Sequence, residues 1–376
     1  MFRVFYLALL FFSVAHVQSQ ISGLALADSL YENRNYTKAI SHYKLSTSTK
    51  EVQVKMAKAY AALGNYSSAL VHYENALAFK ANDALLTYDY GKLLYITKQY
   101  KRALEVFESL IAIDASNPNY YYEQGIILEK LNDTTAQAKY LKVFRLDPFH
   151  QKAIYKIAKH YLIKRKHDSV AHYVAAGLKN YTDNIDLINI KAQNFYWQNN
   201  FEKAAVAFET LLSLGEHTEF IYEKLSLCYA EMYQYHKAIS NRKLALQYNP
   251  NDAVAMYVIG TYYEILKDYE AAEQYITKAL IILDRPLDAE YRKLATIYNR
   301  QEKYKEALST LKKAIAENPN DEFSHFYMAN TKYKYYASYD EKIKAFEDFK
   351  QKFPNSALAS AANTMIKKIK EEQFKN

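Results

Sequence analysis

A block of 34 residues recurs along this chain, and its clearest copy runs from Glu219 to Asp252. Within that copy, Leu225, Tyr229 and Met232 are spaced four and three residues apart, so they share one face of a helix. A short break follows at residues 234–235, and a second helical face begins after it. The block therefore predicts two helices joined by a turn.

A small residue near the start of each second helix gives the phase of the repeat: Ala39, Ala69, Ala103, Ala136, Val170, Ala204, Ala238, Ala272 and Ala307. Successive gaps are 30, 34, 33, 34, 34, 34, 34 and 35 residues, so the connection in the fourth copy is one residue short. Most copies carry an aromatic residue three positions before the small one: Tyr36, Tyr66, Tyr100, Phe201, Tyr235, Tyr269 and Tyr304. All six prolines fall between blocks. A period of this length is typical of a helical solenoid.

Helix packing explains why small residues recur at this spacing along the chain. A second set of small residues lies in the first helices, twelve positions before the first set, at Ala57, Gly91, Ala158, Ala192 and Gly260 among others. Two helices can approach closely where small residues face each other. One helix pair cannot bury its apolar face alone, so the copies are expected to stack, each touching its neighbours.

This pattern resembles the tetratricopeptide repeat family. The resemblance rests on Tyr229, Tyr235, Ala238, Ala245 and Pro250 in one copy, on Gly260, Tyr263, Tyr269, Ala272 and Ala279 in the next, and on Ala295, Tyr298, Tyr304, Ala307, Ala314 and Pro319 in a third. It covers roughly residues 20–354. It implies an all-α fold, an α-α superhelix (solenoid) of about ten helix-turn-helix repeats, and protein–protein binding without chemistry.

The two ends of the chain differ from the repeats. Residues 1–19 are expected to be a secretory signal peptide, because Arg3 precedes an apolar run of 11 residues, Val4 to Val14, and small or neutral residues follow. That run is too short to span a bilayer, which takes about 20 residues. Residues 355–376 are expected to form a C-terminal helix and tail that cap the array, with Leu358, Ala362, Met365, Ile366 and Ile369 on its apolar side.

Composition bears on where the protein works. The single cysteine, Cys228, cannot form an internal disulfide, and an exported chain without disulfides fits the periplasm or envelope of a bacterium. The Lys-, Asn- and Tyr-rich composition resembles that of Bacteroidetes proteins. The formal net charge is +8, and removal of the leader with Arg3 would leave +7.

A stripe opposite the packing face of each first helix provides the candidate binding surface. In tetratricopeptide proteins this stripe lines the concave groove, and here it is rich in Tyr, Lys and Asn: Tyr88, Lys92, Tyr122, Lys152, Tyr155, Lys156, Lys159, Asn189, Gln193 and Tyr196. Amides can bond a peptide backbone, rings can cover its side chains, and lysines can meet carboxylates. The expected partners are therefore other proteins or peptides, with a preference for acidic or C-terminal carboxylate segments.

The sequence also allows functions other than peptide binding. A carbohydrate- or glycan-binding module could use the same tyrosines as stacking platforms. In the fifth block, residues 150–182 hold seven basic residues against one acid, Asp168. This face is either solvated or set against a phosphate-bearing lipid or polysaccharide surface. The export signal argues against nucleic acid, and membrane contact is expected to be peripheral at most. No cofactor, no metal site and no catalytic residue is expected, and the oligomeric state does not follow from the sequence.

Overall fold

The structure is a computed structural model that describes residues 23–79, 83–283 and 287–375. Every regular element in those ranges is an α-helix, which confirms the predicted all-α solenoid. The chain divides into two compact units, Met1–Leu187 (unit 1) and Ile188–Asn376 (unit 2). The expected leader, residues 1–19, lies outside the described residues, and the expectation of one array over 20–354 stays a prediction.

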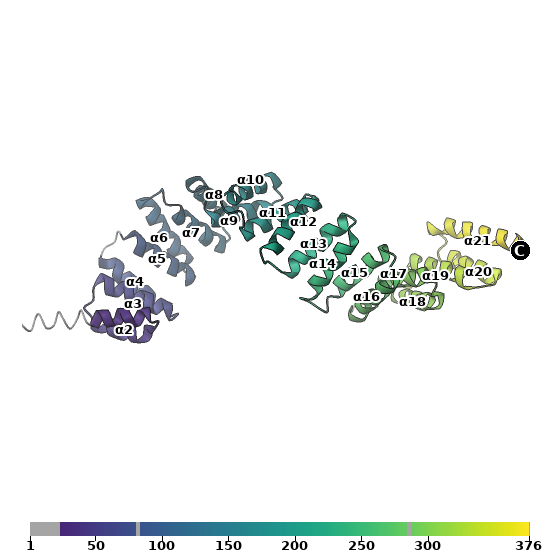
Figure 1. Ribbon diagram of the computed structural model, residues 1–376, viewed down its shortest axis with the longest axis horizontal. Coiled ribbons are helices and arrows are strands. Elements are labelled where there is room, and N and C mark those ends of the chain that lie inside the picture. The colour runs from purple at the N-terminus through teal and green to yellow at the C-terminus, as the bar shows by residue number, and fades with distance from the viewer. Residues whose placement is uncertain (1–22, 80–82, 284–286, 376) are drawn as a thin grey trace, which may run out of the picture. The chain divides into compact units, whose positions relative to one another are not determined.

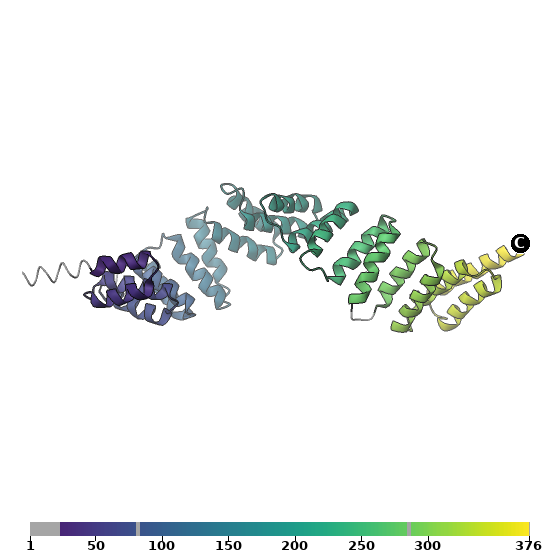
Figure 2. The same cartoon turned by 60° about the horizontal axis from the view of Figure 1, so that its bottom comes forward.

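In unit 1, residues 23–32 form a helix and nine labelled helices follow: α2 (Tyr36–Leu45), α3 (Lys50–Ala62), α4 (Tyr66–Phe79), α5 (Ala84–Ile96), α6 (Tyr100–Ile113), α7 (Pro118–Lys130), α8 (Ala136–Leu146), α9 (Gln151–Ile163) and α10 (His167–Leu178). The division between the units falls within α11 (Ile185–Trp197). Figures 1 and 2 show the helices of unit 1 following one another in chain order. Most contacts join helices that are adjacent in the chain, as stacked pairs require.

Unit 2 continues with ten helices: α12 (Phe201–Ser213), α13 (Glu219–Glu231), α14 (Tyr235–Leu246), α15 (Ala253–Ile265), α16 (Tyr269–Ile282), α17 (Asp288–Arg300), α18 (Tyr304–Glu317), α19 (Glu322–Tyr335), α20 (Tyr339–Lys352) and α21 (Leu358–Lys375). Each helix contacts the next one along the chain from α12 to α21. The predicted block 219–252 is the pair α13 and α14.

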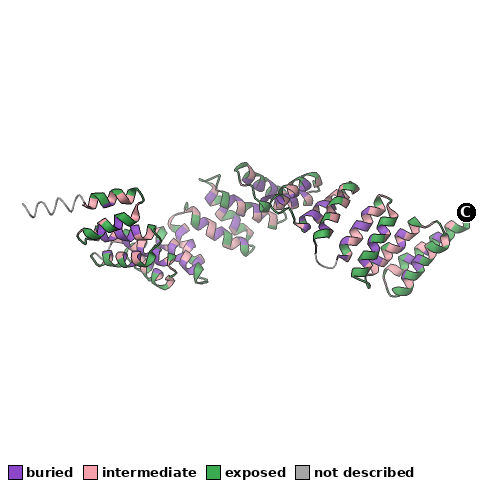
Figure 3. Cartoon of the chain, turned by 90° about the horizontal axis from the view of Figure 1, so that it is seen from below, coloured by how far each residue is buried: buried purple, intermediate pink, exposed green. Residues whose placement is uncertain are grey.

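The small residues that set the period are buried, as the packing argument requires. Ala69, Ala103, Ala238 and Ala272 expose none of their surface, and Ala136 exposes 6%. Figure 3 shows buried and exposed residues alternating along the helices of each unit, so each helix turns one side to its neighbours and the other to solvent. Helix pairs of this kind have thin, shared cores rather than one large core.

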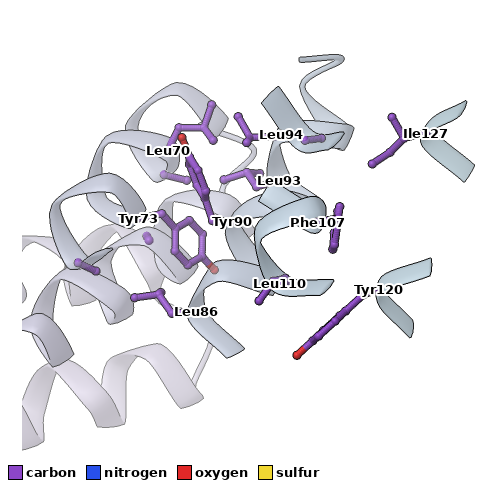
Figure 4. Packing of buried hydrophobic residues seen from close by; sticks show 14 residues of the cluster. Leu70, Tyr73, Leu86, Tyr90, Leu93, Leu94, Phe107, Leu110, Tyr120 and Ile127 are labelled. Atoms are coloured by element: carbon purple, nitrogen blue, oxygen red, sulfur yellow. The ribbon is translucent and has the colours of Figure 1, made fainter. Parts of the chain in front are cut away.

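A representative core lies between α5 and α6 in unit 1 (Figure 4). Phe107 of α6 is fully buried, and a Cβ added to Gly91 of α5 would lie 3.0 Å from its ring. Leu94 and Leu110 are also fully buried in this cluster. The glycine therefore lets the two backbones approach closely enough for the aromatic ring to fill the space between them.

The turn inside most repeats uses a left-handed backbone that the periodicity did not reveal. The second residue after the end of the first helix has positive φ in nine repeats: Arg34, Gly64, Lys98, Asn132, Arg165, Asn199, Tyr233, Lys267 and Glu302. The next amide then donates back to the last turn of the helix, as from Gln99 N to Leu94 O at 2.8 Å. This arrangement closes the helix with a Schellman motif.

We predict opposite effects for two glycine-to-alanine changes in unit 1. Gly64→Ala places a Cβ on a residue with φ of +75°, and it should lower the free energy of unfolding by about 1 kcal/mol. Gly23→Ala, in a helix with nothing within 4 Å of the added Cβ, should raise it by about 0.5–1 kcal/mol. Urea unfolding followed by circular dichroism measures both. Equal shifts from the two variants would contradict the left-handed turn.

The last helix covers the end of the repeats in unit 2. α21 packs on α20 through Ala362, Ile366 and Ile369, which meet Phe346 and Phe349. It begins at Leu358 rather than at the predicted 355, because residues 353–356 form a turn in which the Leu358 amide donates to Ser356 Oγ at 3.0 Å. The other two residues of the expected apolar side, Leu358 and Met365, pack against the same cluster.

Candidate functional site

The predicted stripe residues of unit 1 come from three first helices. Tyr88 and Lys92 lie on α5, Tyr122 lies on α7, and the remainder lie on α9: Lys152, Tyr155, Lys156 and Lys159. On α5 and α9 these residues recur at spacings of three and four, with Tyr155 and Lys156 adjacent, so they share one side of each helix. The side of each helix that carries Leu94, Ile127 or Ile157 is buried instead.

A buried acidic residue of α7 lies against this surface. Glu123 of α7 is 6% exposed, and it accepts a hydrogen bond of 2.7 Å from the Tyr88 hydroxyl. Burial of Tyr88, followed by this hydrogen bond, raises the pKa of its phenol. Tyr88 also packs edge-on against Phe107 at 5.6 Å between ring centroids. The hydrogen bond therefore joins two consecutive repeats, and it holds the Tyr88 ring in place beneath the Lys92 ammonium.

A second acid pairs with one of the predicted lysines. Lys156 Nζ donates to Glu129 Oε2 at 2.6 Å, so this cation is already neutralised within unit 1. Glu123 lies 35 residues after Tyr88, about one period, whereas Glu129 lies 27 residues before Lys156. A search for complementary residues one repeat apart could therefore have found the first pairing but not the second.

Three lysines of the stripe stay exposed and have no acidic partner among the described residues: Lys92, Lys152 and Lys159. Lys92 Nζ lies over the Tyr88 ring at 5.6 Å, and Lys159 Nζ lies over the Tyr155 ring at 5.5 Å. Such cation–π contacts hold the charged groups at the surface without neutralising them. Tyr122, in turn, lies 4.9 Å from the His150 ring, so it belongs to the contact between α7 and α9.

The predicted residues of unit 2 all lie on α11. Gln193 Nε2 donates to Asn189 Oδ1 at 3.0 Å, so the two amides share one hydrogen bond along the helix. Tyr196 is half-buried, and Lys224 Nζ lies over its ring at 4.9 Å. These three side chains form a polar and aromatic surface that can donate and accept hydrogen bonds.

Two kinds of reactive group, a metal-binding cluster and an accessible thiol, would indicate catalysis by the described residues. No group of three or more His, Cys, Asp or Glu side chains that could hold a metal ion occurs among them. Cys228 is fully buried, and burial raises the pKa of its thiol to about 12, so the nucleophilic thiolate is not formed at neutral pH. The histidine of the fifth block nearest the stripe, His150, accepts the Ala153 amide at 3.1 Å as the N-cap of α9.

Comparisons with known proteins agree with this architecture. Models of the tetratricopeptide repeat match residues 60–122, 253–280 and 291–323. TPR repeat-containing protein MJ1428 of Methanocaldococcus jannaschii is 23% identical over 77% of this chain and 54% of its own length. Superkiller protein 3 of Schizosaccharomyces pombe is 23% identical over 76% of this chain and 22% of its own length. This chain thus spans about half of the first relative and about a fifth of the second.

Among solved structures, the C-terminal part of a TPR repeat-containing protein from Cytophaga hutchinsonii matches 64% of this chain and 99% of its own, with a TM-score of 0.51 and 18% identity. That likeness concerns the fold alone. The matched segments, residues 60–122, 253–280 and 291–323, are tetratricopeptide repeats. Proteins of this class generally mediate protein–protein interactions, and the repeat is typically a non-catalytic scaffold. Within the described ranges, no helix is both long enough and apolar enough to cross a bilayer.

Proposed function

We propose that this protein is a non-catalytic adaptor that binds an acidic segment of another protein on the first-helix stripe of unit 1. One observation carries the proposal. Of the two acids near the stripe, Glu129 is paired with Lys156, and Glu123 accepts a hydrogen bond from the neutral Tyr88 hydroxyl, which leaves its charge in place. The three exposed lysines outnumber this one carboxylate, so the surface stays positively charged, which favours a partner that supplies carboxylates.

The surface of α11 in unit 2 supplies a second, separate set of contacts in this proposal. Asn189 and Gln193 share one hydrogen bond, so the remaining donors and acceptors of their amides can meet a peptide backbone. The Tyr196 ring, with Lys224 over it, can cover an apolar side chain. We further propose that the adaptor acts in the periplasm or cell envelope of a bacterium, on the strength of the expected leader and the lack of disulfides.

Site-specific cross-linking in the native cell tests this function. A photoreactive amino acid in place of Tyr155 should cross-link to a protein, and mass spectrometry should find the cross-linked peptide rich in Asp or Glu. The same amino acid at Lys101, which is exposed on α6 outside the stripe, is the matched control. Equal yields at both positions would contradict the proposal. Saturable binding of a glycan at micromolar concentration, lost in Tyr155→Ala, would replace it by the carbohydrate-binding alternative.

A further inference from the structure

A cleft of about 520 Å³ opens in unit 1 where α7, α8 and α9 meet. Its charged and polar lining includes Glu129, Gln137, Tyr140, Lys156, Lys159 and Lys164. Two of these, Lys156 and Lys159, were predicted for the stripe, but the others lie at the turn edge of the fourth and fifth repeats. The cleft is therefore a feature distinct from the remainder of the stripe.

The shortened connection of the fourth repeat explains the opening. In the second and third repeats the second helix begins three residues before the small residue, at the aromatic residues Tyr66 and Tyr100. In the fourth repeat, α8 begins only at Ala136, and Asp133 takes the corresponding position. Asp133 accepts the Thr135 amide at 2.8 Å instead of continuing the helix. The fourth repeat thus lacks the ring that would fill this end of the helix pair.

Two buried polar atoms in the lining have no regular hydrogen bond among the described residues. They are Nε2 of Gln137 and the hydroxyl of Tyr140, a residue that is only 1% exposed. Gln137 also stands where other repeats place an apolar residue, such as Leu70 or Ile239. Burial and the neighbouring Glu129 raise the pKa of the Tyr140 hydroxyl, so Glu129 is its nearest acceptor, although not at regular geometry. Unsatisfied buried donors are rare because they are costly, so the Gln137 amide and this hydroxyl could both gain from an acceptor that enters the cleft.

Charge limits what that acceptor can be. Three lysines and two acids line the cleft, which gives a formal charge of +1. Lys156 pairs with Glu129 at 2.6 Å and lies over the Tyr140 ring at 6.0 Å, so this pair covers the buried hydroxyl. Lys159 and Lys164 have no acidic partner in the part of the chain that the structure describes. A group with one negative charge matches this balance better than a dianion does.

We propose that the cleft binds a single carboxylate of the partner polypeptide, which takes the place of Glu129 beside Tyr140. The Gln137 amide and the Tyr140 hydroxyl then donate hydrogen bonds to it, and Lys159 and Lys164 supply the charge. This inference rests on the proposed function and specifies one contact of it. Glu129 acts as an internal stand-in for the ligand, so it competes with the incoming carboxylate.

Three fluorescein-labelled peptides test the cleft with the full chain, by fluorescence polarisation. Penta-alanine with a free C-terminus offers a terminal carboxylate, an amidated tetra-alanine with one central Asp offers a side-chain carboxylate, and amidated penta-alanine offers none. We expect one or both of the carboxylate peptides to bind more tightly than the neutral one, and the better of the two identifies the source. Equal binding of all three would overturn the inference.

Variants then assign the binding to these residues. Gln137→Leu should weaken carboxylate binding by about fivefold to tenfold, the worth of one hydrogen bond to a charged group, and leave thermal stability unchanged or higher. Glu129→Gln should tighten it, because the competing carboxylate is lost. Lys101→Ser removes an exposed charge outside both the cleft and the stripe and is the control. Unchanged affinity in both cleft variants would overturn the inference. If only the stripe variants lose partner binding, the proposed function holds and the cleft is not part of the binding site.

Discussion

Phe107→Ala should lower the free energy of unfolding by about 3–5 kcal/mol, the cost of removing a large side chain from a tight core. The Phe107 ring is fully buried between α5 and α6 and lies against Gly91. Helices this close cannot collapse into the space that the ring leaves, so a cavity should remain. Urea unfolding monitored by circular dichroism measures the change.

Val71→Ala is the matched control for that variant. Val71 lies on α4 in the same unit and exposes 53% of its surface, so its truncation should change stability by no more than about 0.5 kcal/mol. The Phe107 variant should also weaken partner binding, because Phe107 packs edge-on against Tyr88. A destabilisation below about 1 kcal/mol for Phe107→Ala would contradict the packing of the helix pair.

Asp321→Ala should destabilise unit 2 by about 2–4 kcal/mol, because one carboxylate makes three kinds of contact there. Asp321 is the N-cap of α19 and accepts the Ser324 amide at 2.9 Å and the Ser324 hydroxyl at 2.5 Å. It also pairs with Arg292 of α17, and its side chain is only 10% exposed. Asp321→Asn keeps the cap but removes the charge, so it should cost less than the alanine change.

The Asp321 carboxylate also makes the free energy of unfolding depend on pH, and the direction of this dependence can be worked out. Burial of Asp321 acts to raise its pKa, but the Ser324 hydrogen bonds and the Arg292 charge outweigh it and hold the pKa below 3.8. A carboxyl group whose pKa is lower in the folded state stabilises that state at pH values above its pKa in the unfolded state. This stabilisation is lost as the pH falls through its pKa in the folded state. Unfolding experiments from pH 6 to pH 2 should therefore show a smaller loss of stability below pH 4 in Asp321→Asn than in the unchanged protein. Parallel curves would contradict this account.

Periodicity predicted most of the fold because it reports on packing that recurs in every repeat. The spacing of Ala69, Ala103 and Ala238 placed the close crossings of the helix pairs, and all three residues are fully buried. The left-handed residues such as Lys98 and Lys267 escaped prediction, since their identities vary and glycine occupies the position only at Gly64. Sequence spacing does not show that a backbone has positive φ unless glycine or asparagine marks it.

The candidate site was predictable only in outline. The helical period placed Tyr88 and Lys92 on one side of α5, and the structure puts the Lys92 ammonium over the Tyr88 ring. The bonds to Glu123 and Glu129 depend on how adjacent repeats are set against each other, which the period does not specify. The one-residue shortening of the fourth repeat was visible in the sequence, but the late start of α8 and the cleft beside it required coordinates.

The adaptor function is tested most directly by measuring how tightly the cross-linked partner binds two double variants of this protein. Lys92→Ser with Lys159→Ser removes two exposed charges from the stripe of unit 1, and Lys101→Ser with Lys179→Ser removes two exposed charges from the same unit outside it. Because hydrogen bonds to charged groups are worth about 1.5–3 kcal/mol each, the first pair should weaken binding by about tenfold or more. The second pair should leave the affinity unchanged. Equal affinities for both double variants would contradict the stripe as the binding surface.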